Sequence, residues 1–265
     1  MNTLALGLDR TRVELKMYSR EKEAVFFSFL FPIMLLALFS VIFSSQFDDA
    51  GPDMSAARFF LPGMVSAGVL LTSFQTMAMS VATERDDGTL KRLRSTPMPP
   101  VTYFLGKVGL VGVSSLLQLV VLLLVARFAF GVPLPTSADR WLVFAAVFVL
   151  GVFGGTVLGI AYSSLSTSRS IGAVVIGPQL VLQFISGVYL NFNDVPEWLQ
   201  RIASVFPLKW IAQGMRSVFF PDGMAAQEMA GSWETGRTLL VLGAWALVGL
   251  VLCVTTFKWF KRGSV

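Results

Sequence analysis

Six long apolar runs are the feature that most limits what this chain can fold into. Each is close to the roughly 20 residues that an α-helix needs to cross the hydrocarbon of a bilayer, and none contains Asp or Glu. The chain is 54% hydrophobic and only 14% charged, which is too apolar for a soluble domain. We therefore predict an all-α membrane protein with one transmembrane domain over residues 1–265. The six predicted transmembrane helices are residues 25–43, 59–81, 103–126, 141–162, 171–190 and 239–257.

The segment before the first run, residues 1–23, is polar and basic. Five of its residues recur at helical spacing, namely Leu4, Leu8, Thr11, Leu15 and Tyr18. This pattern predicts an amphipathic helix that lies in the membrane interface and connects to the first span. A disordered tail is the alternative.

The distribution of basic residues predicts the orientation. When both termini are placed in the cytoplasm, most of the 21 Lys and Arg residues fall on the cytoplasmic side, as membrane proteins prefer. The amino-terminal helix and the loop after the second span then share that side, whereas residues 191–237 lie outside.

A short charged island, residues 84–97, reads ERDDGTLKRLRSTP and separates the second and third runs. Charges of this density are costly in hydrocarbon, so the segment belongs in water. Gly88 divides it, and Thr89 is positioned to cap a short helix on which Leu90 and Leu93 share a face. A solvated loop that only fixes the topology is the alternative.

A second informative stretch, residues 191–220, precedes the last run and reads NFNDVPEWLQRIASVFPLKWIAQGMRSVFF. It is too apolar for an ordinary loop, yet Pro196 and Pro207 divide it into two pieces that are too short to span. Such pieces favour re-entrant helices on the outer side. A pair of surface helices lying flat is the alternative.

Both stretches resemble those of the ATP-binding-cassette (ABC) type-2 permeases, in particular the branch associated with drug and antibiotic resistance. The resemblance implies a type V ABC exporter-like fold in a bacterial cell (inner) membrane. It makes the island a coupling helix that docks on a separate ATPase subunit, and residues 191–220 the outer gate. The implied coupling residues are Glu84, Arg85, Gly88, Thr89, Leu90, Leu93, Arg94, Thr96 and Pro97. The implied gate residues are Trp198, Phe206, Pro207 and Trp210.

Two of the runs carry polar side chains at helical spacing, which hydrocarbon cannot satisfy. Helix-to-helix adhesion explains the Ser and Thr positions equally well, but the resemblance assigns these spans to the central cavity of a dimer. The predicted substrate path is Ser73, Thr76, Met77, Gln179, Gln183 and Ser186. Because it offers no fixed charge, we expect a lipophilic or amphiphilic cargo such as a drug, antibiotic or lipid.

The sequence also excludes several kinds of chemistry. It has no GKS or GKT phosphate-binding loop, so ATP and Mg must be bound by a partner ATPase, expected in two copies, and no cofactor by this chain. It has no His and a single Cys, which leaves few metal ligands. We expect a second permease copy and membrane lipid as further partners, and no nucleic acid. An ABC exporter of polysaccharide or lipid-linked glycan, an ion-coupled secondary transporter and an intramembrane enzyme are the alternatives.

Overall fold

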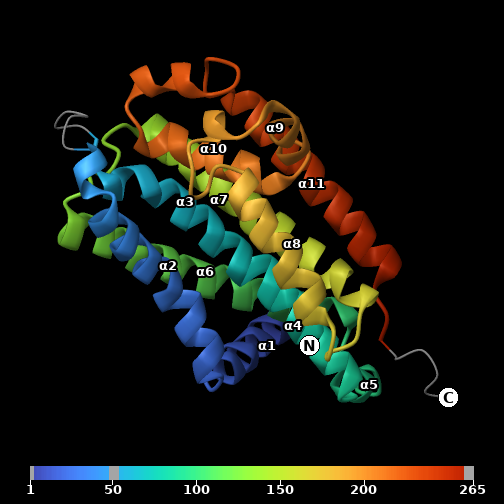
Figure 1. Ribbon diagram of the computed structural model, residues 1–265. Helices are drawn as coiled ribbons and strands as arrows, with labels where there is room; N and C mark the ends of the chain where they lie inside the picture. Colours follow the sequence, from blue (N-terminus) through green and yellow to red (C-terminus); the bar gives the residue numbers. More distant parts are fainter. Residues whose placement is uncertain (1–2, 48–53, 260–265) are drawn as a thin grey trace.

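The computed structural model describes residues 3–47 and 54–259, and this part of the chain consists of helices joined by loops, without a strand. Five helices in it are long and apolar enough to cross a membrane (Figure 1). They are α2 (Lys22–Ile42), the continuous stretch Ala56–Asp86, α6 (Pro100–Phe130), the stretch Ala138–Leu165 that contains α7 (Ala138–Tyr162), and α11 (Thr235–Thr256). Both ends of the chain lie outside the described residues.

The predicted span 171–190 is shorter than expected. It appears as α8 (Ile171–Ile185), whose 15 residues extend about 22 Å at 1.5 Å per residue, less than the roughly 30 Å of a bilayer core. The helix ends because Gly187 takes a left-handed conformation with φ of 70°. The all-helical membrane fold is therefore confirmed, whereas a layout of six full spans is not.

The second long stretch is one helix in three parts. α3 (Ala56–Leu70) passes through a π-helical turn at Leu71–Gln75 into α4 (Thr76–Asp86). The Thr76 hydroxyl donates to the Leu71 carbonyl, five residues back, at 3.0 Å. A π turn adds one residue to the helical cycle and rotates everything after it. It therefore changes which residues of this stretch face the same way.

α1 (Thr3–Tyr18) lies across one end of the bundle against α6 (Figure 1). The helix is where the sequence predicts it, but only the second half of the predicted stripe, Leu15 and Tyr18, packs against the core. Gly7, Glu14 and Tyr18 are buried, whereas Leu4 and Leu8 are exposed. Glycines on α6 make the approach close, since a Cβ at Gly109 would lie 2.2 Å from the Thr11 hydroxyl.

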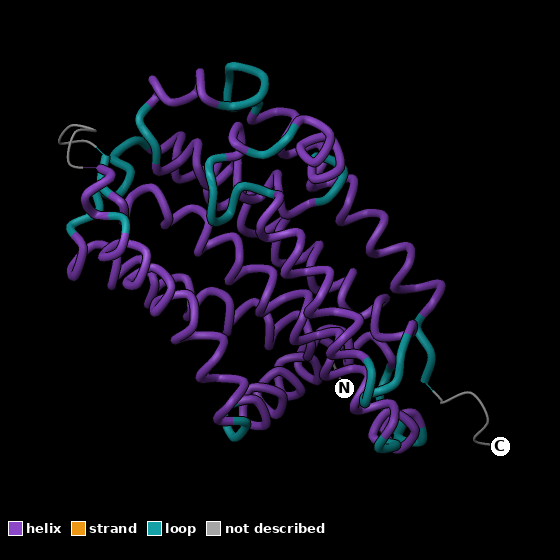
Figure 2. Tube along the Cα trace, viewed as in Figure 1, coloured by secondary structure: helices purple, strands orange, loops and turns teal. Residues whose placement is uncertain are grey.

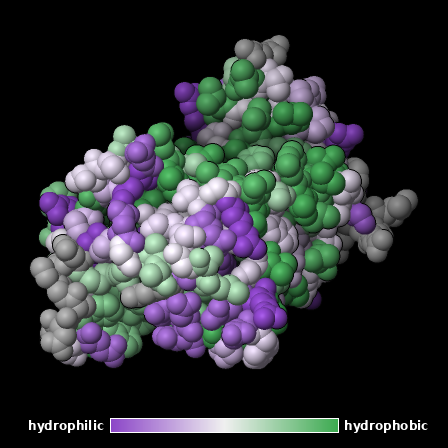
Figure 3. Space-filling view, turned by 90° about the horizontal axis from the view of Figure 1, so that it is seen from above, coloured by the Kyte–Doolittle hydropathy of each residue, from purple (hydrophilic) through white to green (hydrophobic). Residues whose placement is uncertain are grey.

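The opposite end carries the segments before the last span. α9 (Glu197–Ala203) and α10 (Pro207–Phe219) form there, and the loops gather at the two ends of the bundle (Figure 2). α10 is buried against α3, α7 and α11. Arg58 and Arg140 donate to backbone carbonyls at its carboxyl end, at 2.7 and 2.9 Å, where the helix dipole favours positive charge. Seen from this end, hydrophilic patches stand beside a broad hydrophobic area (Figure 3).

The flanks of the bundle present large apolar side chains to the surroundings. Phe128 on α6 is 81% exposed, and Leu240 and Val254 on α11 are exposed as well. A soluble protein rarely exposes so much contiguous apolar surface. Such flanks fit contact with lipid hydrocarbon.

Candidate functional site

A groove of about 760 Å³ runs between α2, the Ala56–Asp86 stretch and α8. Its walls are largely apolar and include the rings of Phe27 and Phe31 from α2. Thr76 from α4, and Gln179 and Gln183 from α8, add neutral hydrogen-bonding groups. A concave, mostly apolar surface with a few polar groups is typical of a site for small molecules.

The groove includes only half of the predicted path residues. Thr76, Gln179 and Gln183 line it. Ser73 and Met77 are fully buried in the packing against α7, where a Cβ on Gly155 would meet the Ser73 hydroxyl at 2.1 Å. The Ser186 side chain is also buried, at the end of α8, outside the groove. These three residues therefore do not line the groove.

For the residues of the Ala56–Asp86 stretch, the π turn explains why the predicted face and the observed face differ. The sequence places Ser66, Ser73 and Ser80 seven residues apart, on one face of a regular helix. The extra residue in the turn separates them. Ser66 and Ser73 are buried, whereas Ser80 lines the groove with Thr76.

The groove also carries fixed charge, contrary to the sequence-based expectation. Glu21 and Glu23, at the α1–α2 junction, line it at the end nearest α1. Asp87, at the end of α4, lines it too. All three side chains are exposed. The neutral walls therefore end in an acidic mouth.

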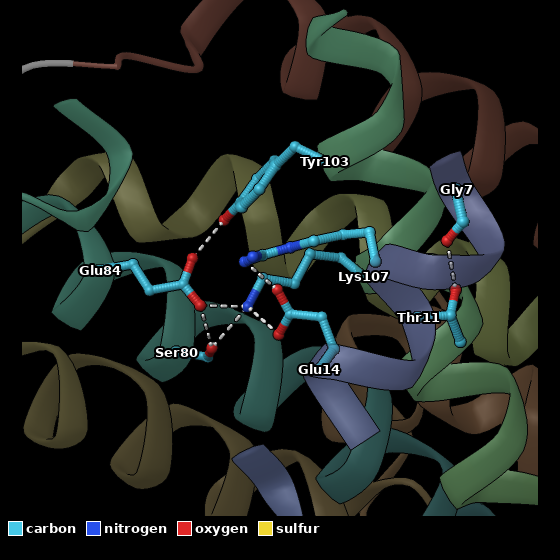
Figure 4. Close-up of polar contacts among 8 residues, drawn as sticks. Gly7, Thr11, Glu14, Ser80, Glu84, Tyr103 and Lys107 are labelled. Carbon is cyan, nitrogen blue, oxygen red and sulfur yellow. Dashed lines mark hydrogen bonds and ion pairs between the residues drawn. The ribbon is translucent and has the colours of Figure 1, made fainter. Parts of the chain in front are cut away.

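Beside this mouth lies a buried charge cluster, formed by Glu14, Glu84 and Lys107 (Figure 4). Lys107 is fully buried, and its Nζ lies 2.9 Å from Glu14 Oε2 and also pairs with Glu84. It donates to the Ser80 hydroxyl at 3.0 Å. The Tyr103 hydroxyl donates to Glu84 Oε2 at 2.9 Å. Every charge in the cluster thus has a partner of opposite sign.

The buried charge cluster joins three elements that are distant in sequence, because Glu14 belongs to α1, Glu84 to α4 and Lys107 to α6. Sequence analysis identified Glu84 in the charged island but missed its partners. One signal was available, since Lys107 is the only charged residue inside the predicted span 103–126. A lysine there requires a counter-ion.

The charged island forms the turn and short helix α5 (Thr89–Arg94). The cap differs from the prediction, because Gly88 is the N-cap with φ of 79° and the Asp87 carboxylate accepts the Thr89 N–H at 2.8 Å. Leu90 is fully buried and Leu93 is half-buried against the chain's own core. The prediction that Leu90 contacts a partner was therefore wrong.

The remaining island residues divide into an inner and an outer group. Arg85 donates to the Ser166 carbonyl at 2.8 Å and also to that of Ser163, which ties α4 to the α7–α8 connection. Arg94, Thr96 and Pro97 are exposed. The exposed group also includes Lys91 and Arg92, so the outer face of α5 is basic.

The predicted gate residues occupy different environments at the other end. Trp198 is 63% exposed on α9, whereas Trp210 is buried on α10 and donates to the Ser204 carbonyl at 2.8 Å. Phe206 and Pro207, where α10 begins, are half-buried. Lys209 Nζ lies 3.7 Å from the centre of the Trp210 ring. Burial lowers the pKa of Lys209 from 10.5 to about 8.

A buried ion pair holds this end together. Arg216 on α10 contacts the Glu228 carboxylate through two nitrogens, at 2.5 and 3.1 Å. A third nitrogen donates to the Gly187 carbonyl at 3.0 Å. This bidentate geometry is the strong form of such a pair. The ion pair fixes α10 to the connection before α11, and the bond to Gly187 fixes it to the loop that follows α8.

Comparison with known proteins identifies the family. A family profile described as "ABC-2 type transporter" matches residues 11–220, which is most of the chain. The chain belongs to the ABC-2 type transporter family. The match spans the groove, the buried charge cluster, α5 and α10, and it ends before α11.

Several curated proteins are similar over much of the chain. The daunorubicin resistance ABC transporter permease protein DrrB1 of Streptomyces coeruleorubidus is 27% identical over 80% of this chain and 71% of its own length. The probable multidrug ABC transporter permease YbhR of Escherichia coli K12 is 23% identical over 73% of this chain, but the match spans only about half, 51%, of that relative's length. The putative transport permease YvfS of Bacillus subtilis is 23% identical over 90% and 91%.

Proposed function

We propose that this ABC-2 chain is the membrane-spanning permease subunit of an ATP-driven exporter of lipophilic or amphiphilic small molecules. The groove is the observation that carries the proposal. Its volume of about 760 Å³ lies within the roughly 300–1,000 Å³ of small-molecule sites. Two relatives bear names that refer to drug resistance or multidrug transport, which supports a drug-like or antibiotic cargo.

The proposal requires a separate source of energy. The sequence lacks a phosphate-binding loop, so ATP and Mg are bound by a partner ABC ATPase, present in two copies. Two permease copies, identical or related, assemble with them in a bacterial inner membrane, with both termini in the cytoplasm. The second copy would enclose the groove.

The basic outer face of α5 is the proposed contact with the ATPase. Lys91, Arg92 and Arg94 are exposed there, next to Thr96 and Pro97. Leu90 contributes without touching the ATPase, because its burial holds α5 against the chain's own core. Motion of the ATPase would then move α5 and α4 together.

The experiment is an ATPase assay of the purified complex in lipid nanodiscs. Lipophilic compounds should change the rate of ATP hydrolysis. Replacing Gln179 and Gln183 with Leu should change which compounds do so, because the replacements remove hydrogen-bonding groups from the groove. Co-purification with the ATPase, which controls for assembly, should be unchanged. If no lipophilic compound changes the rate while the complex moves a sugar polymer across vesicles, the proposed cargo class is wrong.

A further inference from the structure

The charges that line the groove are of one sign. Among the residues described, its lining includes the carboxylates of Glu21, Glu23 and Asp87 and that of Glu84, but no Lys or Arg. Lys107 neutralises Glu84 in the buried charge cluster. Glu21, Glu23 and Asp87 form no ion pair within the described chain. Lys22, between the two glutamates in sequence, does not line the groove.

A second, independent feature lies on the α8 wall. Gln179 is only 4% exposed, and its side-chain oxygen accepts no hydrogen bond in the described structure. A buried acceptor without a donor is unfavourable. The neighbouring glutamine differs, because the Gln183 oxygen accepts the Tyr189 hydroxyl at 2.5 Å. Of the two amides that α8 contributes to the groove, Gln179 is therefore the one whose oxygen lacks a hydrogen-bond donor.

We propose that the groove selects amphiphiles that carry a protonated amine. This inference rests on the proposed function and names the substrate class of the same site. The acidic mouth attracts a cation and disfavours an anion, since a cleft lined by one sign of charge concentrates ligands of the opposite sign. The ammonium N–H supplies the donor that Gln179 lacks.

The aromatic wall suits the same ligand. Phe27 and Phe31 line the groove and their rings are exposed. They offer contact for an apolar body and an aromatic face for a cation. A neutral solute would gain the apolar contact but neither the attraction at the mouth nor, without N–H groups, the hydrogen bond to Gln179.

Three matched fluorescent probes test the inference. Each carries the same dansyl group on a five-carbon chain that ends in a methyl group, a primary ammonium or a trimethylammonium. Binding is measured by dansyl emission with the full-length chain in nanodiscs of zwitterionic lipid. The wild type should bind the primary ammonium probe about tenfold more tightly than the neutral probe, as two or three carboxylates across a hydrated mouth allow. Raising the salt concentration to 1 M should reduce this ratio.

Substitutions test separately the attraction of cations by the acidic mouth and the hydrogen bond to Gln179. Glu21→Gln with Glu23→Gln should reduce the preference for both cations to about twofold, because two charges leave the mouth. The control is Asp194→Asn with Glu197→Gln, which removes the same charge from exposed positions outside the groove and should leave the preference intact.

Gln179→Leu should weaken binding of the primary ammonium probe about fivefold and spare the trimethylammonium probe, because only the first can donate a hydrogen bond. Gln183→Leu is its control, because the Gln183 oxygen already has a donor in Tyr189. The Gln183→Leu variant should leave the ratio of the affinities for the primary ammonium and trimethylammonium probes as it is in the wild type.

The outcomes separate this inference from the proposed function. Equal binding of neutral and cationic probes, or a preference that survives loss of Glu21 and Glu23, overturns the inference and leaves the exporter proposal standing. A Gln179→Leu variant that binds both cations as the wild type does also overturns it. Binding of none of the probes, with no effect of lipophilic compounds on ATP hydrolysis, overturns both.

Discussion

Replacing Lys107 with Met gives the sharpest test of how the ends of α1, α4 and α6 are held together. Lys107 is fully buried and pairs with two carboxylates, those of Glu14 and Glu84, which are themselves almost inaccessible. Methionine conserves much of the volume but removes the charge. Breaking a buried ion pair by removing one partner costs about 3–5 kcal/mol, because a charge is left without compensation.

The variant should therefore unfold at a lower temperature. At about 2–4 °C per kcal/mol for a chain of this size, the apparent unfolding temperature should fall by about 6–20 °C. Tryptophan fluorescence of the detergent-solubilised protein during heating measures the change at a fixed scan rate. Lys16→Met is the matched control, because Lys16 lies exposed on α1 and its loss should change the temperature little.

A second substitution tests the electrostatic explanation itself. Adding Glu84→Gln to Lys107→Met removes a carboxylate that would otherwise be unpaired, while Glu14 keeps its ion pair with Arg10. The double variant should recover a large part of the lost stability. A Lys107→Met protein as stable as the wild type, or a double variant less stable than the single one, would refute the reasoning.

Three further predictions concern other parts of the molecule. Lys209 has a pKa of about 8 in the folded state, against an ordinary value of 10.5. Between pH 8 and 10.5 the unfolded state therefore binds more protons than the folded state, so the free energy of unfolding should rise with pH there. In thermal unfolding, the stability difference between Lys209→Met and the wild type should change over that pH window only. Leu90→Asp should lower the unfolding temperature of the isolated chain, because it buries a carboxylate in the core, whereas Arg92→Glu should leave that temperature unchanged and weaken co-purification with the ATPase. On a Cys253→Ser background, a cysteine at Arg94 should resist an impermeant thiol reagent added to intact cells, and its modification would overturn the orientation.

Much of the fold was predictable because length and hydropathy decide it. Five of the six apolar runs are helices long enough to cross a membrane. The remaining run, residues 171–190, is shortened by Gly187, whose left-handed conformation depends on the fold around it. The short helices α5, α9 and α10 also form within the segments that proline and glycine delimit.

The candidate site was less predictable, since it depends on contacts across the sequence. Glu14 and Lys107 lie 93 residues apart, and no local pattern pairs them. The π turn changes which side chains of the Ala56–Asp86 stretch face the groove, and a regular helical spacing cannot anticipate it. The acidic mouth was missed because Glu21 and Asp87 come from different connections, so only the folded chain brings them to one groove.

The sequence-based prediction of ATP-driven rather than ion-coupled transport rested in part on the absence of acidic residues from the spans. Acidic residues are absent from the predicted runs, which weakens an ion-coupled mechanism. In the structure, the Glu84 carboxylate lies inside the apolar stretch Ala56–Asp86, but Lys107 and Tyr103 occupy it. The carboxylate thus has structural partners and is not free to bind a transported ion.

Transport into inside-out vesicles tests the central claim most directly, namely that this chain moves its cargo only with a partner ATPase. The vesicles contain the chain with a partner ABC ATPase, the chain alone, or the ATPase alone. The measurement is the accumulation of a lipophilic fluorescent compound. We predict accumulation only with both proteins and hydrolysable ATP, and no loss when an uncoupler collapses the proton gradient. Accumulation by the chain alone that is driven by a proton or sodium gradient, and abolished when the gradient is collapsed, would contradict the account.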